Sequence, residues 1–136
     1  MKHTKVLGLV VTMLVPAAVF AGVHGSLDVT IERDPTTGAA IGAQGNEAEA
    51  FNSPDANQLI GCAANPGIGF CQAHDATADA PGLVNFAICT TSDPEKLALI
   101  RAVAEDAFLH FTIDPATGEC LNIRVSHKSI YRPKAH

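Results

Sequence analysis

The sequence predicts a small α+β domain in which an antiparallel sheet of about five strands carries one helix and is held by two disulfide bonds. Short stretches that alternate polar and apolar residues, separated by turn residues, are typical of half-buried strands. The stretch Pro94–Glu105 instead repeats its apolar residues at helical spacing. Four cysteines in 136 residues are typical of a small exported domain that is stabilised by disulfide bonds.

Residues 1–21 have the features of a signal peptide. Lys2 and Lys5 form a short basic region, Val6–Phe20 is apolar, and small residues precede a cleavage site. The apolar stretch is too short to be a good transmembrane span. We therefore expect an exported protein that begins near Gly22, is periplasmic or extracellular, and is not inserted in a membrane after cleavage.

The charge of the exported chain argues against nucleic-acid binding. Loss of the signal peptide leaves seven Lys and Arg residues against fourteen Asp and Glu residues, a net charge of −7. The charge is uneven, because no acidic residue follows Glu119 but four basic residues do: Arg124, Lys128, Arg132 and Lys134. We interpret this basic end as a solvated tail, and the alternative is a small contact with an anionic group.

Residues 22–58 are expected to contribute one strand, Ser26–Glu32, and an irregular N-terminal segment. Within that segment, the stretch 33–58 is rich in Ala, Gly, Asn and Glu and predicts a surface loop, with a short helix near Glu47–Phe51. Residues 59–134 are expected to form the disulfide-bonded core.

Two strands, Gln58–Ala63 and Gly69–Asp75, are predicted around a tight turn at Asn65–Gly67. The turn contains a Pro-Gly pair, which favours a reversal of the chain. This reversal brings Cys62 across from Cys71.

A third strand is predicted at Leu83–Thr90, where Val84, Phe86 and Ile88 share the face expected to point into the core. Cys89 falls on the opposite face of this strand.

The helix Pro94–Glu105 is expected to begin with a capping box formed by Ser92 and Glu95. Its apolar stripe, which we expect to cover the core face of the sheet, consists of Leu97, Ile100, Val103 and Ala104.

A hairpin is predicted from the strands Phe108–Ile113 and Leu121–Ser126, joined by the turn Asp114–Gly118. Its predicted core residues are Leu109, Phe111, Ile113, Leu121, Ile123 and Val125. By this alternation Cys120, like Cys89, lies on the side of the sheet away from the core. This shared facing favours the pairing Cys89–Cys120, which leaves Cys62–Cys71, although the sequence alone permits three connectivities.

The part of the chain from Ile60 onward resembles a group of small exported bacterial proteins with four cysteines. The motifs that carry the resemblance are I-G-C at Ile60–Cys62, C-x-A-x-D-A at Cys71–Ala76, C-T-T-S-D-P at Cys89–Pro94, F-T-I-D-x-x-T-G-E-C at Phe111–Cys120, and S-x-Y-x-P-K ending at Lys134. The resemblance implies an exported, disulfide-bonded fold, and it implies no activity.

No motif in the sequence indicates catalysis or cofactor binding. A metal site would require His74 and His110 to converge, and a metal carrier is one alternative function. If the scaffold has a working surface, we expect it on the face away from the core, at Asn85, His110, Asn122 and Arg124.

The function that the sequence favours is non-enzymatic: binding, or a structural role in the envelope or outside the cell. The expected partner is a protein or an envelope component. A second alternative is a small secreted enzyme or enzyme inhibitor that works through the 33–58 loop.

Overall fold

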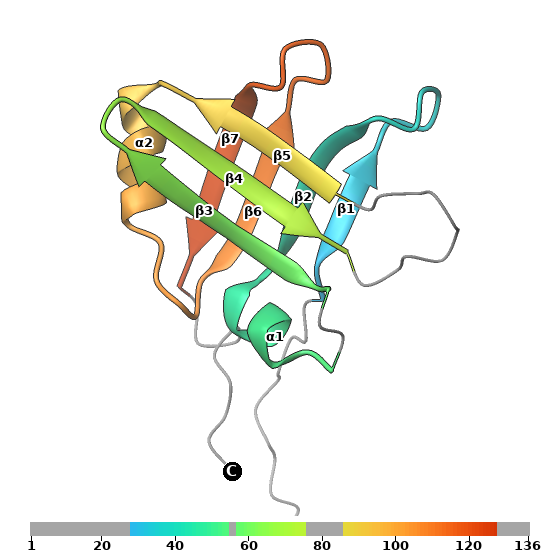
Figure 1. The fold of residues 1–136 in the computed structure, drawn as a ribbon, viewed down its shortest axis with the longest axis horizontal. Helices are drawn as coiled ribbons and strands as arrows, with labels where there is room; N and C mark the ends of the chain where they lie inside the picture. The colour runs from blue at the N-terminus through green and yellow to red at the C-terminus, as the bar shows by residue number, and fades with distance from the viewer. Residues whose placement is uncertain (1–27, 55–56, 76–85, 128–136) are drawn as a thin grey trace, which may run out of the picture.

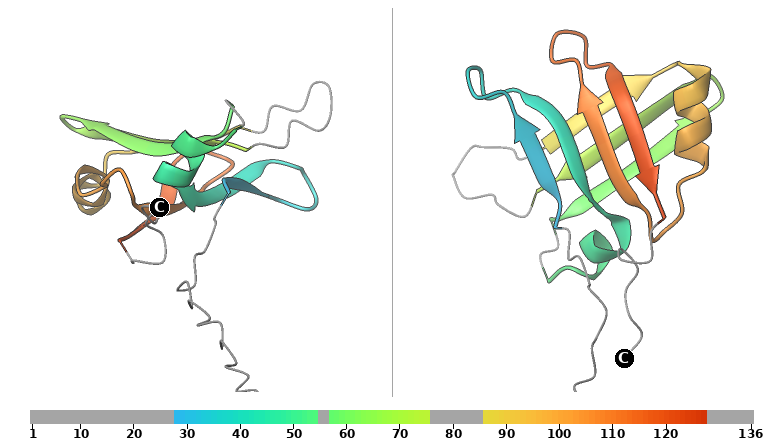
Figure 2. Two further views of the ribbon diagram at one scale, coloured as in Figure 1. Left: turned by 90° about the horizontal axis from the view of Figure 1, so that it is seen from below. Right: turned by 180° about the vertical axis from the view of Figure 1, so that it is seen from behind.

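The computed structural model describes residues 28–54, 57–75 and 86–127, which form two antiparallel sheets packed face to face (Figures 1 and 2). Sheet A has the order β1-β2-β6-β7, with bounds Thr30–Arg33, Ala40–Asn46, Phe108–Ile113 and Cys120–Ser126. Sheet B has the order β3-β4-β5, with bounds Leu59–Asn65, Ile68–His74 and Phe86–Thr91. The helices are α1, Glu47–Asn52, and α2, Pro94–Arg101.

The prediction of a small antiparallel domain with two disulfide bonds is confirmed, but the prediction of one five-stranded sheet with one helix packed on it is wrong. The described residues form seven strands in two sheets, of four and three strands. Among the residues that the structure describes, no helix has the length and apolarity needed to cross a bilayer.

Much of the predicted irregular segment 33–58 is regular structure. β2 pairs with both β1 and β6, so it is an internal strand of sheet A. Its glycines are closely packed, since a Cβ atom at Gly45 would lie 3.0 Å from Cγ2 of Val29. A strand built from such small residues lacks the alternation of large apolar and polar side chains that reveals strands in a sequence. The short helix expected near Glu47–Phe51 is confirmed as α1.

Sheet A is built from two hairpins with nearly identical turns, D-P-T-T-G at 34–38 and D-P-A-T-G at 114–118. The Asp34 carboxylate accepts hydrogen bonds from the backbone N–H groups of Thr36 and Thr37, both at 2.8 Å. Asp114 accepts one from the backbone N–H of Ala116 at 2.9 Å. Both turns lie at the same end of the sheet A strands (Figure 2).

Each turn closes with a glycine, at positions 38 and 118, whose φ is 73°. Such a left-handed conformation favours glycine over residues with a Cβ atom. The turn predicted at Asp114–Gly118 is therefore confirmed, and the same chemistry builds the first hairpin.

The cysteine pairing is as predicted, but the physical reason behind the prediction is wrong. Cys62 bonds Cys71 and Cys89 bonds Cys120. Cys89 and Cys120 are 1% and 0% exposed, so their bridge lies inside the sandwich and not on the side away from the core. The bridge joins β5 of sheet B to β7 of sheet A.

The predicted facing of β5 is inverted. Ala87, Cys89 and Thr91 point inward, whereas Phe86 and Ile88 point outward. Because Cys89 must meet Cys120 across the two sheets, its side of the strand has to face the interior. Alternation along the strand then turns the larger apolar side chains outward.

The facing of Leu121 is also contrary to prediction. The register of β6 with β7 shifts between Thr112, which pairs with Asn122, and Ile113, which pairs with Cys120. Leu121 is therefore the extra residue of a bulge, and its side chain is 58% exposed.

Helix α2 begins at Pro94 as predicted, but its N-cap and its last residue differ from the prediction. Its N-cap is Asp93, whose carboxylate accepts hydrogen bonds from the N–H groups of Glu95 and Lys96, so the predicted Ser92 cap is wrong. The helix ends at Arg101. It contacts β3, β4 and β7 and closes one open side between the sheets, instead of covering a sheet face (Figure 1).

Gly69 on β4 makes room for this helix. A Cβ atom there would lie 2.7 Å from Cδ1 of Ile100 and 2.8 Å from Cδ2 of Leu97, which are the two buried residues of α2. Glycine at this position therefore lets α2 approach the sheet closely.

Gly69→Ala is expected to lower the free energy of unfolding by about 1–3 kcal/mol, because two buried side chains must move to admit the methyl group. Urea denaturation measures this change. Gly61→Ala on β3 is the control, with an expected change within about 0.5 kcal/mol, because only the Glu47 carboxylate is near. Equal stability of Gly69→Ala and the wild type would show that α2 does not pack on β4 as described.

Candidate functional site

The outer face of sheet B, which we call the B face, carries exposed large apolar side chains, including Leu59, Ile68 and Ile88. Register places Leu59 beside His74 and His74 beside Phe86. The remaining outward side chains along the three strands are Ala63, Asn65, Ile68, Phe70, Gln72, Ile88 and Thr90.

The B face is accessible and carries no acidic residue, lysine or arginine among these outward positions. Ile68 and Ile88 are 51% and 44% exposed. The rings of His74 and Phe86 contact each other in a tilted arrangement, with 4.6 Å between their centroids. Contiguous exposed apolar surface of this kind is typical of an interaction site.

Two strands of sheet B, β4 and β5, reverse the usual distribution of side-chain size. Its inward positions include Gly69, Cys71 and Ala73 on β4, and Ala87 and Cys89 on β5. Antiparallel sheets with one face in water normally put large apolar side chains inside and polar ones outside. The sequence of β5 shows this alternation, but it does not show which side of the strand faces the core, because that depends on the bridge from Cys89 to Cys120.

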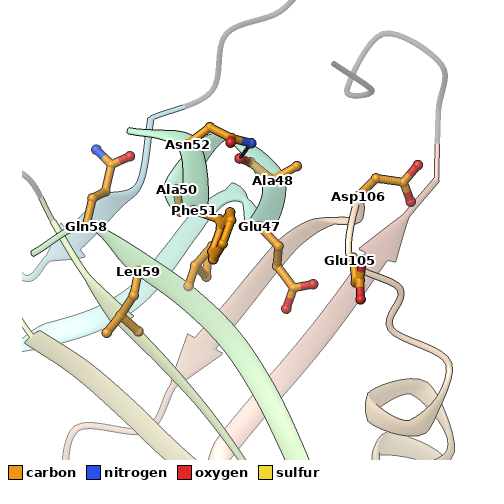
Figure 3. A pocket seen from close by; sticks show the side chains of 10 residues that line it. Glu47, Ala48, Ala50, Phe51, Asn52, Gln58, Leu59, Glu105 and Asp106 are labelled. Atoms are coloured by element: carbon orange, nitrogen blue, oxygen red, sulfur yellow. Dashed lines mark hydrogen bonds between the residues drawn. The ribbon is translucent and has the colours of Figure 1, made fainter. Parts of the chain in front are cut away.

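A pocket of about 640 Å³ adjoins the B face where α1 meets β3 (Figure 3). We call it the α1 pocket. Leu59 belongs to both surfaces. Phe51, the most exposed large apolar residue of those described, stands at the pocket. The described residues that line it are Glu47, Ala48, Ala50, Phe51, Asn52, Gln58, Leu59, Ile60, Glu105 and Asp106.

Buried Asn46 fixes α1 against the segment that precedes β6. Its side-chain oxygen caps the helix by accepting from the N–H of Glu49 at 3.0 Å. Its amide nitrogen donates to the carbonyl of Asp106 at 3.3 Å. The N–H of Glu47 donates to the carbonyl of Ala107 at 3.1 Å. These bonds hold the acidic residues of α1 and of this segment on one pocket wall.

Glu47 is the electrostatically unusual residue of the pocket. Burial, and to a smaller extent the negative charge of Glu105, together raise the pKa of its half-buried carboxyl group to about 7. The carboxylate lies against β3, since Oε1 is 3.3 Å from where a Cβ atom of Gly61 would be. Among the residues that the structure describes, no lysine or arginine lines the pocket.

Gln58 forms part of the opposite side of the pocket from Glu105 (Figure 3). The residue is 6% exposed, and its side-chain oxygen has no hydrogen-bond partner among the described residues. A buried polar atom without a partner is costly, so a donor brought in by a ligand would stabilise it.

The predicted surface site is only partly assembled. His110 and Arg124 are cross-strand neighbours on the outer face of sheet A, and Asn122 follows on the same face. The described residues do not include Asn85, which the prediction also named.

On that face, Nε2 of His110 lies 3.5 Å from Oε1 of Glu32, close enough for an ion pair when the histidine is protonated. Glu32 reaches across β2 because Gly42 leaves space, since a Cβ atom there would lie 3.0 Å from the Glu32 carboxylate.

The structure separates the two histidines of the predicted metal site. His74 points outward from sheet B and His110 outward from sheet A, so they lie on opposite faces of the sandwich and cannot share an ion. Among the described residues, no cluster of three or more His, Cys, Asp or Glu side chains could hold a metal ion.

Comparisons with family models, curated proteins and solved structures found no match. The resemblance to exported four-cysteine proteins therefore stays a prediction.

Glu47→Gln is expected to flatten the pH dependence of stability between about pH 4.5 and 7. The pKa of Glu47 is higher in the folded protein, about 7, than its ordinary value of 4.5, so the folded state binds the proton more tightly. The stabilisation is complete below pH 4.5 and is lost as the pH rises through 7. Urea denaturation across this range measures the slope.

Phe51→Ala, which changes the pocket wall without removing a carboxyl group, is the control and should keep the wild-type slope. An unchanged slope in Glu47→Gln would mean that Glu47 is not buried against β3 and Glu105.

Proposed function

We propose that this chain is an exported, non-enzymatic binding protein that docks a partner protein on the B face. The observation that carries the proposal is the outward placement of Ile68, Phe70, Phe86 and Ile88, whose burial against a partner would be favourable. An exposed apolar sheet face is otherwise a hazard for aggregation. A partner that covers the B face accounts for the outward apolar side chains and removes the hazard of aggregation.

The chemistry of the face specifies the partner surface. The B face has no acidic or basic side chain among its described outward positions, so an apolar, uncharged surface complements it. A charged group placed there would lose its hydration without gaining an opposite charge. The strongly negative chain also makes an anionic lipid surface a poor match.

The two disulfide bonds indicate a non-reducing environment for the folded chain. This supports an exported location, either the periplasm or the cell exterior, and a partner that is encountered there. The predicted signal peptide at residues 1–21 supports the same location.

A photo-crosslinking amino acid placed at position 88 should capture a discrete protein in the envelope or culture fraction of the native cells. The same group at position 124, on the outer face of sheet A, is the matched control and should capture none. Adding Ile68→Glu to the position-88 variant should lower the crosslink yield at least about tenfold, because it places an unpaired charge in the interface.

The substitution at the half-exposed position 68 is expected to change the free energy of unfolding by less than about 1 kcal/mol, which urea denaturation checks. Equal capture from positions 88 and 124 would contradict the proposal. Adducts that contain only lipid, or only a second copy of the chain, would contradict it as well.

A further inference from the structure

We propose that the C-terminal segment 128–136 of this chain docks in its own α1 pocket, with Arg132 and Lys134 beside the acidic wall. The segment lies outside the described residues, and its sequence, K-S-I-Y-R-P-K-A-H, supplies both basic and apolar side chains. The inference is independent of the partner proposed for the B face.

Charge complementarity favours segment 128–136 as the occupant of the α1 pocket. The pocket wall carries Glu47, Glu105 and Asp106, and no lysine or arginine of the described ranges 28–54, 57–75 and 86–127 lines it. Of the undescribed stretches of the exported chain, only 128–136 contains Lys or Arg. The segment has three such residues and no acid.

The point where the described chain ends places the segment next to the pocket. Ser126 pairs with Phe108 in the antiparallel register of β7 with β6. The chain after Ser126 therefore runs toward Ala107 and Asp106, and Asp106 lines the pocket. Nine extended residues span roughly 30 Å, which is enough to cross a pocket that begins at this point.

The apolar part of the lining suits the apolar part of the segment. Phe51 and Leu59 offer exposed apolar surface in the same pocket, and Ile130 and Tyr131 directly precede Arg132. The buried Gln58 oxygen without a partner among the described residues would accept a hydrogen bond from an incoming N–H group. The pocket can thus accommodate both kinds of side chain.

The test compares residues 22–136 with 22–127, which retains all described strands and helices. NMR titration of the Glu47 carboxyl carbon is the readout. Docked cations favour the ionised carboxylate, so the pKa of Glu47 should be lower in the longer chain than in the shorter one. Arg132→Ala with Lys134→Ala should reproduce the shorter chain, whereas Ser129→Ala, the control, should behave as the longer one.

A second readout is the backbone ¹⁵N relaxation of residues 129–134. Their order should be high in the longer chain, should fall in Glu47→Gln with Glu105→Gln, and should be unchanged on dilution. Identical Glu47 titration in the two chains would overturn the proposal. Order that disappears on dilution would also overturn it, because the segment would then dock on a second copy.

Discussion

The Cys89–Cys120 bridge is the constraint on which the rest of the structure depends. It lies inside the sandwich and ties β5 of sheet B to β7 of sheet A across 31 residues of chain. Closing a loop of that length stabilises the fold by about 4 kcal/mol, against about 3 kcal/mol for the nine-residue Cys62–Cys71 loop. The longer bridge also decides which face of β5 points inward.

The inward orientation of Cys89 determines which side chains of β5 lie on the surface of the protein. With Cys89 inside, Phe86 and Ile88 must lie outside, and they join Ile68 and Phe70 of the neighbouring strand. The core is then filled from sheet A, mainly by Leu109, Phe111, Ile113 and Ile123. The fold therefore leaves large apolar side chains of sheet B available for a partner, while sheet A faces outward with His110, Asn122 and Arg124.

Features set by local chemistry were predictable from the sequence. The Asp114–Gly118 turn, the Asn65–Gly67 turn and the start of α2 at Pro94 depend on neighbouring residues, and all three are confirmed. Features that depend on contacts between residues far apart in the chain could not be predicted from the sequence. β2 has small residues because other elements pack closely on it, and the facing of β5 depends on a bridge to residue 120.

The α1 pocket could not be predicted from the sequence either, because it depends on contacts between distant residues. The α1 pocket joins residues 47–52, 58–60 and 105–106, which no local pattern connects. The raised pKa of Glu47 depends on burial in this assembled pocket and on the charge of Glu105, so neither cause is visible in the sequence around position 47. Of the predicted surface residues, His110, Asn122 and Arg124 lie on the outer face of sheet A, where strand alternation alone could place them.

The central claim is that sheet B presents its larger apolar residues to the solvent. Methyl NMR with a soluble gadolinium chelate tests it directly, because the chelate broadens signals according to their distance from bulk water. The structure predicts strong broadening for the methyl groups of Ile68 and Ile88 and little for those of Ile113 and Ile123. Protection of Ile88 equal to that of Ile113 would contradict the claim, because sheet B would then turn its larger apolar residues into the core.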